Sequence, residues 1–110
     1  MNQMSDVGCR TAEEPCALAL ELYTLAGHLR DAPHLDGERC RMIEAEMSCI
    51  ARAAANVRDY GLGARLRAQA DRLWHCATAG GLAVPAALEL ADWLDDRANE
   101  LAASAAGGAA

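Results

Sequence analysis

The amino-acid sequence predicts an all-α fold: a small antiparallel bundle of about four helices. Apolar side chains recur at steps of three and four residues in four successive segments, which keeps one face of each helix apolar. Gly and Pro residues separate these segments. The apolar content is mostly Ala and Leu, which favour helices, and no sustained alternation of apolar and polar residues indicates a strand.

Length and composition indicate one domain with two unstructured ends. A chain of 110 residues is long enough to bury a core without disulfides or metals. Residues 1–10 are mostly polar, and residues 104–110 are small side chains and Gly. We therefore expect a flexible arm at 1–10, a helical bundle at 11–103 and a disordered tail at 104–110.

The first helix is predicted to begin at Thr11. The Thr11 hydroxyl can cap the helix, Glu14 follows three residues later, and Pro15 falls in the first turn, where its missing N–H costs nothing. Pro33 ends the helix, because the residue before a proline is disfavoured in helical geometry. The core face is predicted at Leu18, Leu22, Leu25 and Leu29, with Leu20 and Tyr23 widening it.

The second helix is predicted from about Asp36 to Tyr60 and carries the most regular apolar stripe in the chain. Its steps of three, four, three, four and three span Cys40, Ile43, Met47, Ile50, Ala54 and Val57. Gly61 follows directly, where a glycine commonly caps the C-terminus of a helix.

The third and fourth helices follow the same pattern. The third is predicted from about Leu62 to Ala79, ended by Gly80 and Gly81, and the fourth from Val84 to about Ala103. Short connections favour antiparallel neighbours, although three helices with a loosely docked fourth remain an alternative. The predicted core positions are Leu66, Ala70, Leu73, Ala77, Ala87, Leu90, Leu94, Ala98 and Leu101.

The charge balance argues against some classes of partner. The formal net charge is −6, and every basic residue is Arg. Direct nucleic-acid binding needs clustered positive charge, as does attraction to an anionic membrane surface, so we expect neither. No apolar stretch approaches the roughly 20 residues that span a bilayer, and residues 1–10 lack the features of a secretory signal. We expect a cytoplasmic protein with reduced thiols.

No motif for catalysis or metal binding stands out. The five Cys and three His residues form no close pair with the usual zinc spacing. Cys40 and Cys49 lie nine residues apart, which puts them about 180° apart on one helix. No Glu-x-x-His motif of a di-iron bundle and no phosphate-binding glycine loop occurs. We therefore expect no cofactor, no metal and no enzymatic activity.

The fourth helix carries the most unusual surface, which we call the acidic stripe. Carboxylates at steps of three, four and four form one face, with Trp93 at its edge. Like charges four residues apart repel, so the stripe costs stability and serves either solubility or the binding of a basic partner. The candidate partner-binding residues are Glu89, Asp92, Trp93, Asp96 and Glu100.

The third helix carries a basic cluster, Arg65, Arg67 and Arg72. These guanidinium groups could pair with the acidic stripe inside the bundle or between two chains. The acidic chain and the small number of basic residues argue against a DNA-reading helix.

The preferred functional hypothesis is a non-enzymatic acidic interaction protein that binds and modulates, or inhibits, a macromolecule with a basic surface. The partner would be a protein, such as a nucleic-acid-binding complex. Some phage-encoded inhibitors of bacterial defence, anti-CRISPR proteins among them, have this size and charge, a comparison that rests on no motif. The alternatives are a metal- or redox-responsive bundle that uses Cys and His, and a homodimer.

Overall fold

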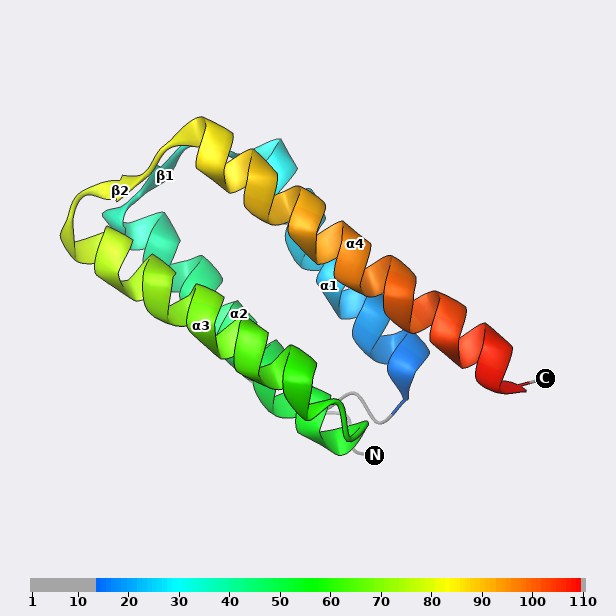
Figure 1. The fold of residues 1–110 in the computed structure, drawn as a ribbon. Helices are drawn as coiled ribbons and strands as arrows, with labels where there is room; N and C mark the ends of the chain where they lie inside the picture. Colours follow the sequence, from blue (N-terminus) through cyan, green and yellow to red (C-terminus); the bar gives the residue numbers. More distant parts are fainter. Residues whose placement is uncertain (1–13, 110) are drawn as a thin grey trace, which may run out of the picture.

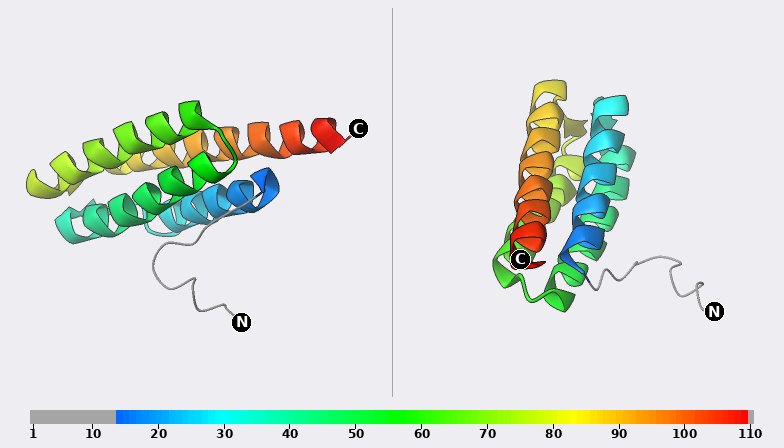
Figure 2. Two further views of the ribbon diagram at one scale, coloured as in Figure 1. Left: turned by 90° about the horizontal axis from the view of Figure 1, so that it is seen from below. Right: turned by 90° about the vertical axis from the view of Figure 1, so that its right-hand side faces the viewer.

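The structure is a computed structural model that describes residues 14–109, with side chains described for residues 14–104. It confirms the all-α bundle (Figure 1). The helices run in alternating directions, and α1 packs mainly against α4 while α2 packs mainly against α3 (Figures 1 and 2). The helices are α1 (Pro15–Asp31), α2 (Gly37–Asn56), α3 (Tyr60–Thr78) and α4 (Val84–Ala109).

One hydrophobic core takes side chains from all four helices. The predicted apolar stripe of α2 is buried from Cys40 to Ala54, and Val57 is half-buried at the end of the helix. The predicted core positions of the other three helices are buried as well. The largest fully buried side chains are Leu18, Leu22, Leu25, Leu29, Cys40, Met47, Leu66, Leu73 and Leu94.

The prediction that Leu20 and Tyr23 widen the core face of α1 is wrong. The side chain of Leu20 is 65% exposed and that of Tyr23 is 36% exposed. The Tyr23 hydroxyl instead donates a hydrogen bond to Asn99 of α4 on the outer surface. Small residues such as Ala19 and Ala26 complete the buried face of α1, so the helix needs no wider apolar stripe.

The break between α2 and α3 differs from the predicted one. α2 ends at Asn56, and Gly61 lies in the first turn of α3 instead of capping α2. The chain turns at Arg58, whose φ of 61° is in the left-handed region, a conformation more common for glycine. The Asp59 carboxylate then accepts a hydrogen bond from the Leu62 N–H at 3.1 Å, so this local cap starts α3 ahead of Gly61.

The other helix ends agree more closely with the sequence. Pro15 is the first residue of α1, and Thr11 lies outside the described residues, as does the predicted arm at 1–10. The Asp36 carboxylate caps α2 by accepting a hydrogen bond from the Arg39 N–H at 2.9 Å. α4 continues to Ala109, beyond its predicted end near Ala103.

A short antiparallel ladder, absent from the sequence prediction, joins two loops at one end of the bundle. Strand β1 (Leu35–Asp36) pairs with β2 (Gly81–Leu82), with Leu35 opposite Leu82. Gly81 has a φ of 135°, and a Cβ there would collide with the Leu35 carbonyl oxygen. This close approach requires glycine, and the ladder ties the connection between α1 and α2 to that between α3 and α4.

Candidate functional site

The acidic stripe lies on the outer surface of α4. The side chains of Glu89, Asp92, Asp96 and Glu100 are all exposed, while Leu90 and Leu94 between them are buried. The described side chains of α4 include five carboxylates and one guanidinium, which gives this helix a net charge of −4. The bundle therefore presents the predicted stripe to solvent.

Arg30 of α1 neutralises part of this face. Its guanidinium contacts the Asp92 carboxylate at 2.6 Å and the Asp95 carboxylate at 2.5 Å. The hydrogen bond to Asp92 and then the one to Asp95 raise the pKa of Arg30 above its usual value. Because Arg30 and Asp92 lie 62 residues apart in the chain, helical spacing alone could not reveal this pair.

Arg97 occupies a second part of the stripe. Its guanidinium makes two hydrogen bonds to the Glu100 carboxylate, at 3.0 and 2.7 Å. It also lies 5.5 Å from the centre of the Trp93 ring, a cation–π distance. Trp93 is half-buried and packs against the core, so Arg97 and the core cover much of the ring.

Two carboxylates of the acidic stripe have no Arg partner among the described residues. Among the described residues, Glu89 and Asp96 form no ion pair and no side-chain hydrogen bond. The same holds for Arg65 and Arg72 on the neighbouring helix α3. Within the part of the chain that the structure describes, no ion pair therefore joins the basic cluster to the acidic stripe.

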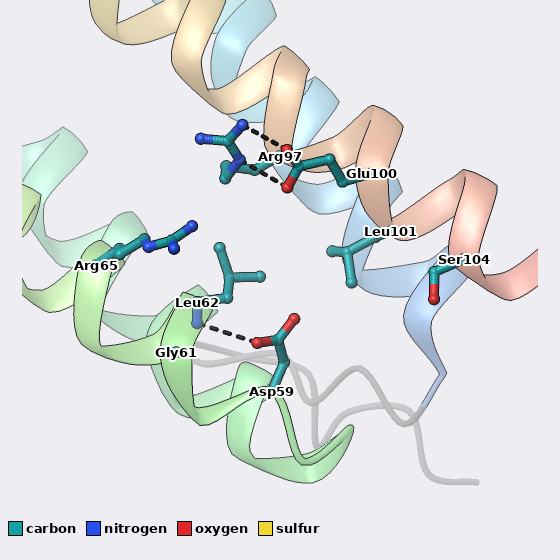
Figure 3. A pocket seen from close by; sticks show the side chains of 8 residues that line it. All are labelled: Asp59, Gly61, Leu62, Arg65, Arg97, Glu100, Leu101 and Ser104. Atoms are coloured by element: carbon teal, nitrogen blue, oxygen red, sulfur yellow. Dashed lines mark hydrogen bonds and ion pairs between the residues drawn. The ribbon is translucent and has the colours of Figure 1, made fainter.

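A pocket of about 250 Å³ lies between the start of α3 and the second half of α4 (Figure 3). Leu62 and Leu101 supply apolar walls, while Arg65 and the paired Arg97 and Glu100 supply charge. Asp59 also lines it, with its carboxylate already engaged at the start of α3. The lining could hold a small polar group. Its hydroxyl, that of Ser104, makes no hydrogen bond to Asp59 or Glu100 among the described residues.

Two cysteines of different helices lie at the same end of the α2–α3 pair, where a Cβ on Gly37 of α2 would lie 2.7 Å from the Ala77 carbonyl oxygen of α3. Cys40 of α2 is buried, Cys76 of α3 is half-buried, and both carry free thiols. Burial raises the pKa of the Cys40 thiol, with smaller contributions from Cys76 and Asp36. Spacing within a single helix could not find this pair, because its members come from different helices.

The remaining Cys and His residues are dispersed. Cys16 is exposed and free, whereas Cys49 is disulfide-bonded, so the expectation of reduced thiols is wrong for Cys49. The His28 ring lies 3.6 Å from the Glu46 carboxylate. Within residues 14–104, no group of three or more Cys, His, Asp or Glu side chains is arranged to hold a metal ion.

Comparisons with known proteins assign neither a family nor a function to this chain. No protein-family model matches the chain, and searches of curated proteins and of solved structures find no significant match. No helix in the described part of the chain is both long and apolar enough to cross a membrane.

Proposed function

We propose that this protein is a non-enzymatic interaction protein that binds a macromolecule with a basic surface through the acidic stripe of α4. The observation that carries the proposal is the pair Glu89 and Asp96. Both are exposed on a regular helix, and neither is paired within the described residues. A carboxylate held on a helix can meet an incoming guanidinium or ammonium group with little loss of backbone entropy.

Asp92, Glu100 and Trp93 have a secondary role in this proposal. The two carboxylates already bind Arg30 and Arg97, so a partner would have to compete for them. The half-buried Trp93 would contribute only the part of its ring that the core and Arg97 leave open. An inhibitor or small regulator of a nucleic-acid-binding complex is the specific form of this function that we favour, because such complexes present basic surfaces.

The double variant Glu89→Arg with Asp96→Arg tests the proposal. It reverses the two charges that are unpaired among the described residues and leaves Asp92 free to hold Arg30. We expect proteins captured by the tagged wild-type chain from an extract of its host, quantified by mass spectrometry, to be lost with the variant. Circular dichroism should show unchanged helix content.

The matched control is Asp31→Arg with Asp71→Arg, which introduces the same change of charge at exposed positions outside α4. This control should capture the same proteins as the wild type. Capture of an unchanged set of proteins by the Glu89→Arg, Asp96→Arg variant would refute a role for the acidic stripe.

A second candidate is a thiol-based response, and the two free thiols at the same end of the α2–α3 pair, Cys40 and Cys76, favour it. Two neighbouring thiols can bind a soft metal ion such as Cu(I) as thiolates. We would measure melting temperature with and without one equivalent of Cu(I) under reducing conditions, for the wild type and for Cys76→Ser. A stabilisation that disappears in Cys76→Ser supports this candidate, and identical melting of the wild type with and without Cu(I) rejects it.

A further inference from the structure

We propose that the basic surface recognised by the acidic stripe is helix α3 of a second copy of this chain, which gives a two-fold symmetric dimer. The inference rests on the proposed function in taking α4 as the binding face. It starts from two rows of charged side chains that form no ion pair among the described residues, Arg65 and Arg72 on α3 and Glu89 and Asp96 on α4, the two helices that line the pocket.

The two rows match in length. Arg65 and Arg72 are seven residues apart, as are Glu89 and Asp96. Seven residues are two turns of an α-helix, so each row places its charges on one face about 10.5 Å apart. All four side chains are exposed.

The two rows also lie at the same level along the bundle. Arg65 lines the pocket with Arg97 and Glu100 (Figure 3). Asp96 directly precedes Arg97 in the chain, so Arg65 and Asp96 lie at similar levels along the bundle. Because α3 and α4 are antiparallel, seven residues forward along α3 correspond to seven residues back along α4 (Figure 1). Arg72 therefore lies near the level of Glu89.

These positions select one symmetry for the dimer. A two-fold axis parallel to the helices places α3 of each copy opposite α4 of the other and preserves the level of each charge. Arg65 then meets Asp96 of the other copy, and Arg72 meets Glu89. An axis across the helices would instead set α3 against α3 and α4 against α4, which like charges oppose.

The helices that form this face have opposite net charge. α3 carries three Arg and one Asp, a net charge of +2, and α4 has a net charge of −4. Ala68 lies between Arg65 and Arg72 and is exposed, so a small side chain separates the two guanidinium groups. This leaves room for another helix to approach the row.

A charge-exchange experiment tests the dimer. Analytical ultracentrifugation over a range of concentrations measures the mass of three proteins: the wild type, the double variant Glu89→Arg with Asp96→Arg, and the double variant Arg65→Glu with Arg72→Glu. We expect the wild type to dimerise and each variant alone to bind itself at least about tenfold more weakly, a change worth about 1.4 kcal/mol. An equimolar mixture of the two variants should recover the dimer, since their rows are again complementary.

The control is Arg67→Glu with Asp71→Arg, which alters exposed charges of α3 outside the row and should leave the dimer unchanged. Circular dichroism of each variant checks that the helices remain folded. A monomeric wild type, or folded variants that fail to associate when mixed, would overturn the dimer.

These outcomes separate this inference from the proposed function. A monomeric wild type that still captures host proteins through Glu89 and Asp96 overturns the dimer alone. A dimer with the expected charge exchange, accompanied by no stripe-dependent capture, overturns the external partner and leaves the self-association standing.

Discussion

At the scale of single residues, the carboxylates of the acidic stripe have unequal surroundings although the sequence spaces them regularly. Arg30 holds Asp92 and Arg97 holds Glu100, while Glu89 and Asp96 remain unpaired among the described residues. The sequence predicted which residues form the stripe because helical periodicity sets the direction of each side chain. It could not predict the Arg30 pair, which depends on where α1 lies.

Leu22 and Leu20 provide a matched comparison of two leucines on one helix. Leu22 is fully buried and Leu20 is 65% exposed. We expect Leu22→Ala to lower the free energy of unfolding by about 2–5 kcal/mol, because it leaves a cavity in the core. Leu20→Ala should change it by less than about 0.5 kcal/mol. Urea unfolding followed by circular dichroism measures both, and equal losses would contradict the assignment of the core face.

At the scale of helices, the carboxylates of α4 repel one another, and nearby Arg side chains offset only part of this repulsion. Asp92, Asp96 and Glu100 follow one another at four-residue steps, and each such pair of like charges costs a few tenths of a kcal/mol. Asp96 and Glu100 lie more than two turns before Ala109, the last residue of α4, so the helix dipole adds little to this cost. Ion pairs with Arg30 and Arg97 offset some of this cost.

From this repulsion we predict the stability of the double variant Glu89→Arg with Asp96→Arg, which is also the variant that tests the proposed function. In Glu89→Arg with Asp96→Arg, the new Arg at position 96 lies four residues from both Asp92 and Glu100. We therefore expect the free energy of unfolding to stay level or rise by a few tenths of a kcal/mol. Thermal melting monitored by circular dichroism measures it, and a fall of more than about 1 kcal/mol would show that Glu89 or Asp96 supports the fold.

Two glycines show how packing between helices determines the effect of a glycine-to-alanine substitution on stability. A Cβ on Gly27, inside α1, would meet nothing within 4 Å, so Gly27→Ala should raise the free energy of unfolding by about 0.5–1 kcal/mol. A Cβ on Gly37, at the start of α2, would lie 2.7 Å from the Ala77 carbonyl oxygen. Gly37→Ala should therefore destabilise by about 1–3 kcal/mol, because α2 and α3 must separate. Chemical unfolding of both variants checks this, and the same sign for both would contradict it.

At the scale of the whole molecule, the two helix pairs form one cooperative unit. Their buried residues belong to a single core, and the β1–β2 ladder joins their connections at one end. Neither pair can bury its large side chains alone, so partial unfolding would expose the leucines of the other pair.

The two tryptophans test this cooperativity, since Trp74 lies on α3 beside Arg41 and Trp93 lies on α4 beside Arg97. We expect the single-tryptophan variants Trp74→Phe and Trp93→Phe to give, each by itself, the same urea midpoint by fluorescence and by circular dichroism. Separate midpoints for the two probes within one variant would show that the helix pairs unfold independently.

The sequence by itself determined the four helices and most of the core. Steps of three and four residues fix which face of a helix is apolar, and burial of Leu18, Met47, Leu73 and Leu94 follows from that spacing. The prediction was wrong at Leu20, which lies off the regular spacing of the core leucines and is exposed to solvent. It was also wrong at Gly61, because the Asp59 carboxylate caps α3 and places Gly61 in its first turn.

Only the tertiary structure decided which surfaces meet. Periodicity orients each helix about its own axis but does not say which helix lies beside it or at what level. The placement of Cys40 and Cys76 at one end of the α2–α3 pair and the ladder at Gly81 therefore appear only in the packed bundle. The same packing leaves Arg65 and Arg72 unpaired beside Glu89 and Asp96 among the described residues, and from that arrangement the proposed dimer follows.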